Sequence, residues 1–246
     1  MWLGLAGFGV VFLSAALMLG LTFLRRKSPP NFREIPAFIH LKQAIGRVVE
    51  DGSRLHVSLG RGSLTTPQSA SALAGLALLT RLADLTSASD KPPVVTSGDA
   101  ALSLLSRDTL QAAAHASGQG VYDPNAARLT GLTPFSYAAG AMPVIHDENV
   151  STNVLIGNFG AEAALLTEAS NRTNAFSLTA SDNLPAQAIL YASGQEPLIG
   201  EELFAAGAYV EAGPMHAASL TVQDILRWTI VVGILIGIIL KFLNLI

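Results

Sequence analysis

Uninterrupted apolar residues occupy both ends of the chain, whereas apolar and polar positions alternate at short periods between them. The two apolar stretches are Trp2–Leu24 and Ile225–Ile246. As helices they would rise about 34 Å and about 33 Å, enough to cross the roughly 30 Å hydrocarbon core of a bilayer. We therefore expect two transmembrane helices joined by one polar segment.

The first apolar stretch differs from a secretory signal peptide. Such a peptide carries basic residues before its apolar core and a small-residue cleavage site after it. Here no Lys or Arg precedes the stretch, and Arg25-Arg26-Lys27 follows it directly. The pattern favours an anchor that is not cleaved.

Basic residues predict the orientation of both spans, because cytoplasmic flanks carry an excess of Lys and Arg. Trp2 would lie in the outer aromatic belt, Arg227 and Trp228 at the inner end of the second span, and Lys241 near its outer end. We expect a cytoplasmic central domain with both termini outside. The cations that follow the first span are Arg25, Arg26, Lys27, Arg33, Lys42 and Arg47.

Small residues recur four positions apart within both spans, as Ala16 and Gly20 and as Gly233 and Gly237. This spacing lets two helix backbones approach closely, so it predicts helix–helix packing at these residues. The alternative is that the glycines have no special role, since glycine is frequent in membrane helices.

Residues 25–52 combine a basic juxtamembrane segment, broken at Ser28-Pro29-Pro30, with an amphipathic helix that ends at Asp51-Gly52. From residue 53 to residue 220, short apolar strands then alternate with helices. The predicted strands are Leu55–Gly60, Pro93–Ser97, Arg128–Leu132, Asn153–Gly157 and Ala175–Thr179. The predicted helices are Ser69–Leu85, Ala100–Ser117, Ser136–Ile145, Ala161–Ser170, Pro185–Ala192 and Gly200–Val210.

This alternation predicts an α/β domain with a doubly wound, mostly parallel (Rossmann-like) sheet of about five strands, covered by helices on both faces. At its end, Thr221-x-x-Asp224 matches a capping box. We expect it to begin the helix of residues 221–246 that continues into the second span.

The segment between the spans is poor in charge. From Ser28 to Leu220 it holds ten Lys or Arg and 17 Asp or Glu, about 14% of its residues, and its net charge is −7. Globular domains average about 25% charged residues. Either small neutral residues simply replace charged ones, or copies of the chain or other subunits cover much of the surface; we favour the second interpretation. The negative charge argues against nucleic-acid binding, and the absence of cysteine excludes disulfides and thiolate chemistry.

Glycine-rich and polar residues follow the predicted strands, where ligands bind in open parallel sheets. Gly60-Arg61-Gly62-Ser63 could hold an anion with backbone N–H groups, with Arg61 as the counter-charge. It lacks the third glycine of the dinucleotide fingerprint and the ending of a P-loop. The alternative is a sharp turn that needs glycine and a helix-capping residue. Ser97, Asn158 and Glu162 lie at or just after the ends of other predicted strands.

Asp99 and Asp182 each follow a predicted strand and could together bind a divalent cation. Aspartate is also a preferred N-cap, and we expect this role rather than a metal site. The five histidines are dispersed, and no nucleophile, base and oxyanion donors can be grouped. For His56, which alternates with apolar residues in a strand, we expect a hydrogen-bonded packing role. We expect no cofactor.

Several stretches carry a resemblance to a known family. They include LHVSLGRGSL at Leu55–Leu64, KPPVVTSGD at Lys91–Asp99, NVLIGNFGAE at Asn153–Glu162 and LIGEELFAAGAY at Leu198–Tyr209. With them the chain resembles an uncharacterised family of bacterial two-span membrane proteins, a domain of unknown function. The resemblance implies no activity, ligand or catalytic residue.

Three functions follow as hypotheses. The first is a non-enzymatic, membrane-anchored scaffold or accessory subunit that self-associates, with the bilayer, copies of itself or other subunits as partners. The second is a module that binds a small anionic or nucleotide-like ligand at the strand ends. The third is a membrane-associated enzyme acting on a lipid- or nucleotide-linked substrate, with Asp99, Glu162 and Asp182 as candidates.

Overall fold

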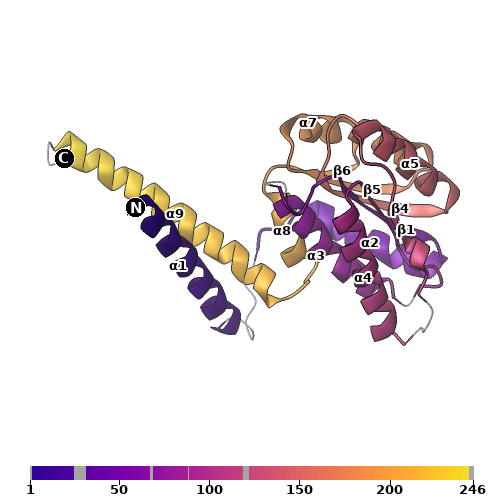
Figure 1. The fold of residues 1–246 in the computed structure, drawn as a ribbon, viewed down its shortest axis with the longest axis horizontal. Helices are drawn as coiled ribbons and strands as arrows, with labels where there is room; N and C mark the ends of the chain where they lie inside the picture. Colours follow the sequence, from indigo (N-terminus) through magenta and orange to yellow (C-terminus); the bar gives the residue numbers. More distant parts are fainter. Residues whose placement is uncertain (1, 25–31, 67–68, 88, 119–121, 244–246) are drawn as a thin grey trace. The chain divides into compact units, whose positions relative to one another are not determined.

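The computed structural model describes the chain except residues 1, 25–31, 67–68, 88, 119–121 and 244–246 (Figure 1). The predicted roles of Arg25, Arg26, Lys27 and the Ser28-Pro29-Pro30 break lie outside the described residues, as does that of the Trp2 side chain. The chain divides into a helical unit formed by its two ends and an α/β unit, Glu34–Ala212.

The helical unit consists of α1 (Trp2–Leu24) and α9 (Pro214–Phe242), which pack side by side in opposite directions (Figure 1). Both are long and apolar enough to cross a membrane, and their apolar side chains are largely uncovered. A Cβ atom added at Gly20, Gly233 or Gly237 would meet no atom within 4 Å. Within one chain, these glycines are therefore not points of close helix contact.

Helix α9 begins earlier than the sequence pattern predicts. Its first residue is Pro214, and Thr221 lies inside the helix, where its hydroxyl donates to the carbonyl of Ala217. Thr221 and Asp224 therefore do not form the predicted capping box. Proline suits the first helical turn because its missing N–H would be unpaired there in any case.

The α/β unit is built on a six-stranded, all-parallel sheet with the strand order β3-β2-β1-β4-β5-β6. The predicted α/β class is confirmed, with one strand more than expected. The strands are β1 (Arg54–Gly60), β2 (Val94–Ser97), β3 (Ala127–Leu129), β4 (Val150–Asn158), β5 (Phe176–Ser181) and β6 (Glu196–Leu198). The helices are α2 (Pro36–Asp51), α3 (Ser69–Leu85), α4 (Ala100–Ala116), α5 (Pro134–Asp147), α6 (Ala163–Arg172), α7 (Leu184–Ser193) and α8 (Glu202–Tyr209), with a short 3-10 helix at Pro124–Ala126.

The two faces of the sheet differ in chemistry. Leu55, Val57 and Leu59 of β1 join a large apolar core with residues of α2, α3, α4 and α8. The alternate residues His56 and Ser58 are polar, fully buried and directed to the opposite face, which α5 and α6 cover. The charge-poor composition therefore partly reflects neutral polar groups that the fold buries.

Both edges of the sheet are short. Strands β3 and β6 have three residues each, and β6 contains Pro197, which cannot donate a ladder hydrogen bond. Such edges discourage the addition of further strands. The same shortness explains why β6 gives no strand signal in the sequence.

The polypeptide enters and leaves the α/β unit at one place. Phe38 of α2 stacks on Tyr209 of α8, with ring centroids 4.8 Å apart. Lys42 pairs with Glu211 at 2.9 Å. His40 contacts Glu196 at the start of β6, so this junction lies at the edge where the strands begin, here called the amino edge. The edge where the strands end, called the carboxyl edge, is opposite.

Candidate functional site

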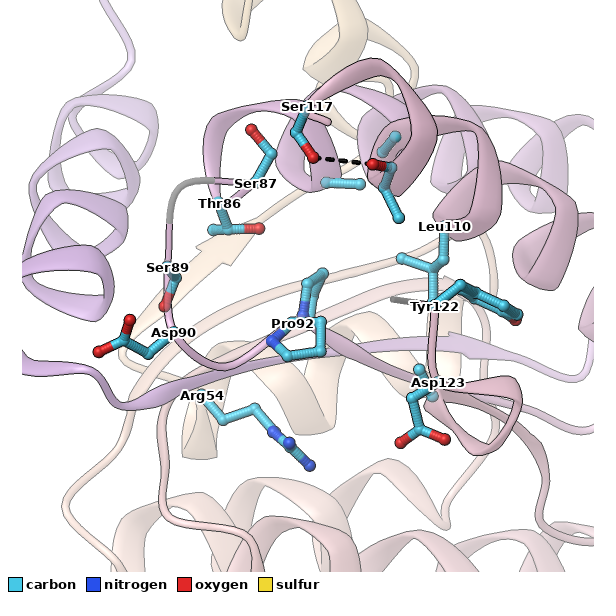
Figure 2. A pocket seen from close by; sticks show the side chains of 15 residues that line it. Arg54, Thr86, Ser87, Ser89, Asp90, Pro92, Leu110, Ser117, Tyr122 and Asp123 are labelled. Carbon is cyan, nitrogen blue, oxygen red and sulfur yellow. Dashed lines mark hydrogen bonds between the residues drawn. The ribbon is translucent and has the colours of Figure 1, made fainter. Parts of the chain in front are cut away.

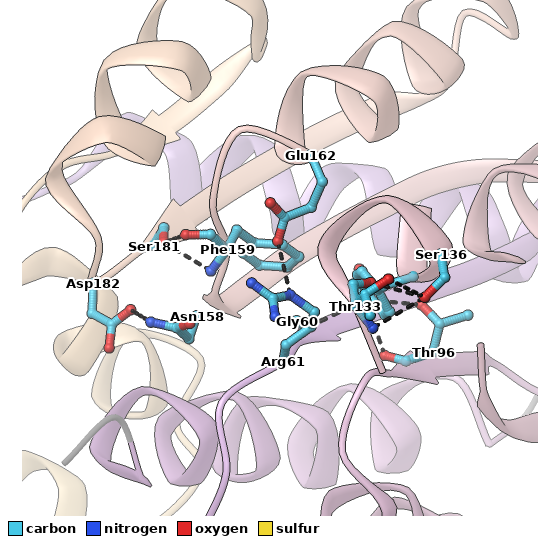
Figure 3. Close-up of polar contacts among 12 residues, drawn as sticks. Gly60, Arg61, Thr96, Thr133, Ser136, Asn158, Phe159, Glu162, Ser181 and Asp182 are labelled. Carbon is cyan, nitrogen blue, oxygen red and sulfur yellow. Dashed lines mark hydrogen bonds and ion pairs between the residues drawn. The ribbon is translucent and has the colours of Figure 1, made fainter. Parts of the chain in front are cut away.

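The strand order reverses direction between β1 and β4. Chain connections run outward from β1 through β2 to β3, and outward from β4 through β5 to β6. In doubly wound sheets the crevice outside the carboxyl ends of the strands at this switch point is the usual ligand site. Gly60 and Arg61 from β1, and Asn158 and Glu162 from β4, lie there, as the sequence pattern predicts (Figure 3).

Contacts within the protein use the first backbone N–H donors of the turn at Gly60. Gly60 has a φ of +68°, and a Cβ atom there would lie 2.3 Å from the carbonyl oxygen of Asn158. Its N–H donates to the hydroxyl of Tyr137 at 3.3 Å, and the Arg61 N–H donates to the Asn158 carbonyl at 2.9 Å. The Gly60 and Arg61 amides, two of the donors that would hold an anion, are thus satisfied inside the protein. This geometry favours the turn interpretation of the glycines.

The side chain of Arg61 is also engaged. Its stem covers Gly98, where an added Cβ would lie 2.4 Å from the Arg61 Cγ atom. Its Nε donates to Glu162 Oε1 at 3.2 Å, and the Glu162 side chain is only 1% exposed (Figure 3). A buried carboxylate needs a cation or hydrogen bonds to remain charged. Arg61 serves that need, so its charge is already balanced by the protein.

A second set of contacts surrounds Asp182. Asn158 Nδ2 donates to Asp182 Oδ1 at 2.8 Å, and the Ser71 hydroxyl donates to Asp182 Oδ2 at 2.8 Å. These bonds tie the ends of β4 and β5 to the first turn of α3. Asp182 is not a helix cap, because the N-cap of α7 is the next residue, Asn183.

Asp99 does cap a helix, as predicted: its Oδ1 accepts from the Leu102 N–H at 3.0 Å at the start of α4. Strands β1 and β4 separate it from Asp182, which is about 14 Å at the usual strand spacing. The two carboxylates therefore cannot share one cation. Among the described residues there is no group of three or more His, Asp or Glu that could hold a metal ion.

The remaining predicted residues have local roles. Gly62 is buried beyond the turn, and the Ser63 hydroxyl lies 3.2 Å from that of Thr65. Ser63 does not cap α3, whose first residue is Ser69. The buried Ser97 hydroxyl donates to the Asp99 carbonyl at 3.3 Å. Asp99, Glu162 and Asp182 thus each have separate structural partners.

Behind the switch point lies a fully buried polar chain centred on His56. Its Nδ1 is 2.7 Å from Asn153 Oδ1, and its Nε2 is 2.9 Å from the Thr96 hydroxyl. Thr96 in turn lies 3.3 Å from the hydroxyl of Tyr137, which accepts from Gly60 N–H. The predicted packing role of His56 is confirmed.

The chain of bonds assigns the histidine tautomer. The Asn153 amide nitrogen contacts the Ser170 hydroxyl, so its oxygen is the atom that faces His56. An amide oxygen only accepts, so His56 Nδ1 carries the proton and Nε2 accepts from Thr96. Sequence reasoning missed the partners Thr96, Asn153 and Tyr137, although the first two occupy polar positions within apolar strands.

Burial lowers the pKa of His56 to about 4, because the ring is desolvated; the hydrogen bond that the ring donates to Asn153 opposes this only in part. Burial likewise raises the pKa of Tyr137, with its hydrogen bonds to the hydroxyls of Ser58 and Thr96 acting in the opposite direction. Both side chains are therefore neutral at physiological pH, as the bonding pattern requires.

The chain belongs to the family described as "Domain of unknown function (DUF6754)", which matches residues 5–246. The resemblance to a family of unknown function is thereby confirmed. Comparison with curated proteins and with solved structures finds no match.

The titration of His56 predicts how stability depends on pH. Below pH 6.5 the unfolded chain binds a proton at His56 that the folded chain binds only near pH 4. The free energy of unfolding should therefore fall as pH is lowered from 6.5 towards 4, by up to about 3 kcal/mol from this residue. Urea unfolding of the wild type and of His56→Gln at several pH values measures how much of this pH dependence comes from His56. If the free energy of unfolding fell equally steeply with pH in both proteins between pH 6.5 and 5, this prediction would be contradicted.

The Arg61–Glu162 pair predicts a non-additive pair of substitutions. Arg61→Met leaves the Glu162 carboxylate buried without a cation, which should lower the free energy of unfolding by about 3–5 kcal/mol. Adding Glu162→Met removes the stranded charge, so the double variant should recover most of the loss. Denaturant unfolding of both variants measures this. A double variant no more stable than Arg61→Met would show that the two side chains do not act as a pair.

Proposed function

We propose that this protein is a membrane-anchored assembly subunit that self-associates through the carboxyl edge of its α/β unit. The observation that carries the proposal is a set of exposed, large apolar side chains around that edge, here called the carboxyl rim. At least one follows each of the six strands, and two follow β3. In strand order, the rim residues are Leu73, Leu104, Leu132 with Phe135, Leu165, Leu184 and Ile199.

The rim residues are between 39% and 77% exposed. Leu132 and Phe135 are 68% and 66% exposed, and Leu184 is 77% exposed. Single exposed apolar residues are ordinary, but their collection on one edge is typical of an interaction surface. On the helices and connections nearer the amino edge, the described residues include only Ile39 and Tyr191 as comparably exposed large apolar side chains.

Other features of the α/β unit support an assembly role over the alternatives. The anion-binding hypothesis is weakened, because the Gly60 and Arg61 amides are bonded inside the protein and the Arg61 side chain already pairs with Glu162. The enzyme hypothesis is weakened, because its candidate carboxylates do not form one cluster: Asp99 and Asp182 lie at strand ends separated by two other strands. A surface with few charges also suits an interface that is covered by another subunit.

The helical unit supports the membrane part of the proposal. Helices α1 and α9 leave their apolar surfaces uncovered by the rest of the described chain, which a bilayer would remedy. We place the α/β unit in the cytoplasm at the bacterial inner membrane, with both termini outside, because cations such as Arg33, Lys42 and Arg47 follow the first span. The partners are the bilayer, further copies of the chain and other membrane-protein subunits.

The attachment of the α/β unit to the membrane helices also favours an interface at the carboxyl rim. The chain enters and leaves the α/β unit at the amino edge, where Phe38 stacks on Tyr209. Within the α/β unit, the described residues at which the chain enters and leaves therefore lie at the edge opposite the carboxyl rim. Molecules held in one membrane also meet at a high effective concentration, which strengthens a modest interface.

Replacing rim residues should break the assembly. Light scattering of the purified protein in mild detergent should give the mass of an oligomer. Leu132→Ser with Phe135→Ser should shift it towards a monomer, because the apolar area that drives association is lost. The control Ile39→Ser with Tyr191→Ser removes exposed apolar residues elsewhere and should leave the mass unchanged. A stable wild-type monomer without partners would contradict the proposal.

A further inference from the structure

The α/β unit contains a cavity of about 500 Å³ at the amino edge, opposite the switch point (Figure 2). It lies between the ends of α3 and α4 and the segments that lead into β2 and β3. Its size falls in the range of small-molecule sites. Nothing in the carboxyl-rim proposal uses it.

One part of the cavity wall is apolar. It is formed by small and rigid side chains, so it would contact a hydrocarbon group without having to rearrange. These residues are Ala83, Pro92, Pro93, Leu110, Ala113 and Ala126.

A second part of the wall offers hydrogen-bond acceptors. Asp90 and Asp123 contribute carboxylates. The hydroxyls of Thr86 and Ser117 donate to carbonyls of their own helices, so lone pairs are what they can offer a ligand. The ends of α3 and α4 add the partial negative charge of helix C-termini. This environment favours an ammonium group.

The third part of the wall is cationic and incompletely satisfied. Arg54, at the start of β1, shares the single carboxylate of Glu148 with Arg128. Two cations thus face one anion, and the Arg54 Nε atom is buried with no hydrogen-bond partner among the described residues. A buried unpaired donor costs about 1–3 kcal/mol, which a ligand carboxylate could recover.

We propose that this cavity binds a small zwitterion with an apolar body, its carboxylate at Arg54 and its ammonium among Asp90, Asp123 and the helix ends. A ligand without a carboxylate would leave Arg54 Nε without an acceptor, and a ligand without an ammonium group would place no positive charge beside the two aspartates. A neutral ligand would make neither of these interactions. The class therefore includes aliphatic amino acids.

Isothermal titration of the full-length protein in detergent tests the proposal with defined probes. The zwitterions are L-leucine and 6-aminohexanoate, which differ in the spacing of their charges. Hexylamine and hexanoate carry one charge each. At least one zwitterion should bind about tenfold or more tightly than both single-charge probes, the equivalent of one additional charged hydrogen bond.

Conservative substitutions identify the site. Arg54→Lys keeps a cation beside Glu148 but removes the Nε donor, and should weaken zwitterion binding about tenfold. Asp123→Asn keeps an oxygen for its bond from the Asn125 N–H, and Asp90→Asn likewise keeps the side-chain shape. Both should weaken zwitterion and hexylamine binding without weakening that of hexanoate, because the aspartates do not attract an anion. Glu168→Gln, on exposed α6, is the control and should bind like the wild type.

Two results would overturn the proposal. One is that neither zwitterion binds more tightly than the single-charge probes. The other is that binding survives unchanged in both Arg54→Lys and the double variant Asp90→Asn with Asp123→Asn. Neither result bears on self-association, because the carboxyl rim lies at the opposite edge of the sheet.

Discussion

The approach of β1 to β4 at their carboxyl ends is the constraint on which the rest of the structure depends. A Cβ atom at Gly157 would lie 2.1 Å from the Leu59 carbonyl oxygen, and one at Gly60 would lie 2.3 Å from that of Asn158. Only glycine permits such contact between two backbones. Beyond this close approach of β1 to β4, Arg61 pairs with Glu162, and the Gly60 N–H donates to Tyr137.

These contacts decide how the switch point can be used. In many doubly wound folds this crevice is open and its amides hold a ligand. Here the Arg61–Glu162 ion pair occupies the crevice. A buried series of hydrogen bonds through Tyr137, Thr96 and His56 lies behind it. Fold analogy alone would assign a nucleotide site, whereas the bonding of this chain favours a filled edge surrounded by an apolar rim. The open cavity lies at the other edge, beside Arg54.

Much of the fold could be predicted from local patterns. Apolar runs such as Asn153–Gly157 identify buried strands, and Asp99 identifies a helix start, because both signals depend only on neighbours in sequence. Strand β6 escaped prediction because three residues that include Pro197 carry no strand pattern. The early start of α9 was missed because Thr221 and Asp224 match a capping box in sequence, whereas the helix already begins at Pro214 after Gly213.

The candidate site was predictable only in part. Parallel topology brings strand ends together, so Arg61, Asn158 and Glu162 could be grouped from the sequence. Whether their donors would be free could not be known, since Tyr137 and Ser71 come from helices distant in the chain. The carboxyl rim and the cavity at Arg54 depend on exposure and packing, for which a single sequence carries no signal.

Cross-linking in native membranes tests most directly whether the carboxyl rim is an interface. The chain has no cysteine, so a single introduced thiol is unique. With a short bismaleimide, Leu132→Cys should give a covalent dimer of the chain, whereas Tyr191→Cys near the amino edge should remain monomeric. Efficient cross-linking at Tyr191→Cys with none at Leu132→Cys would contradict the account.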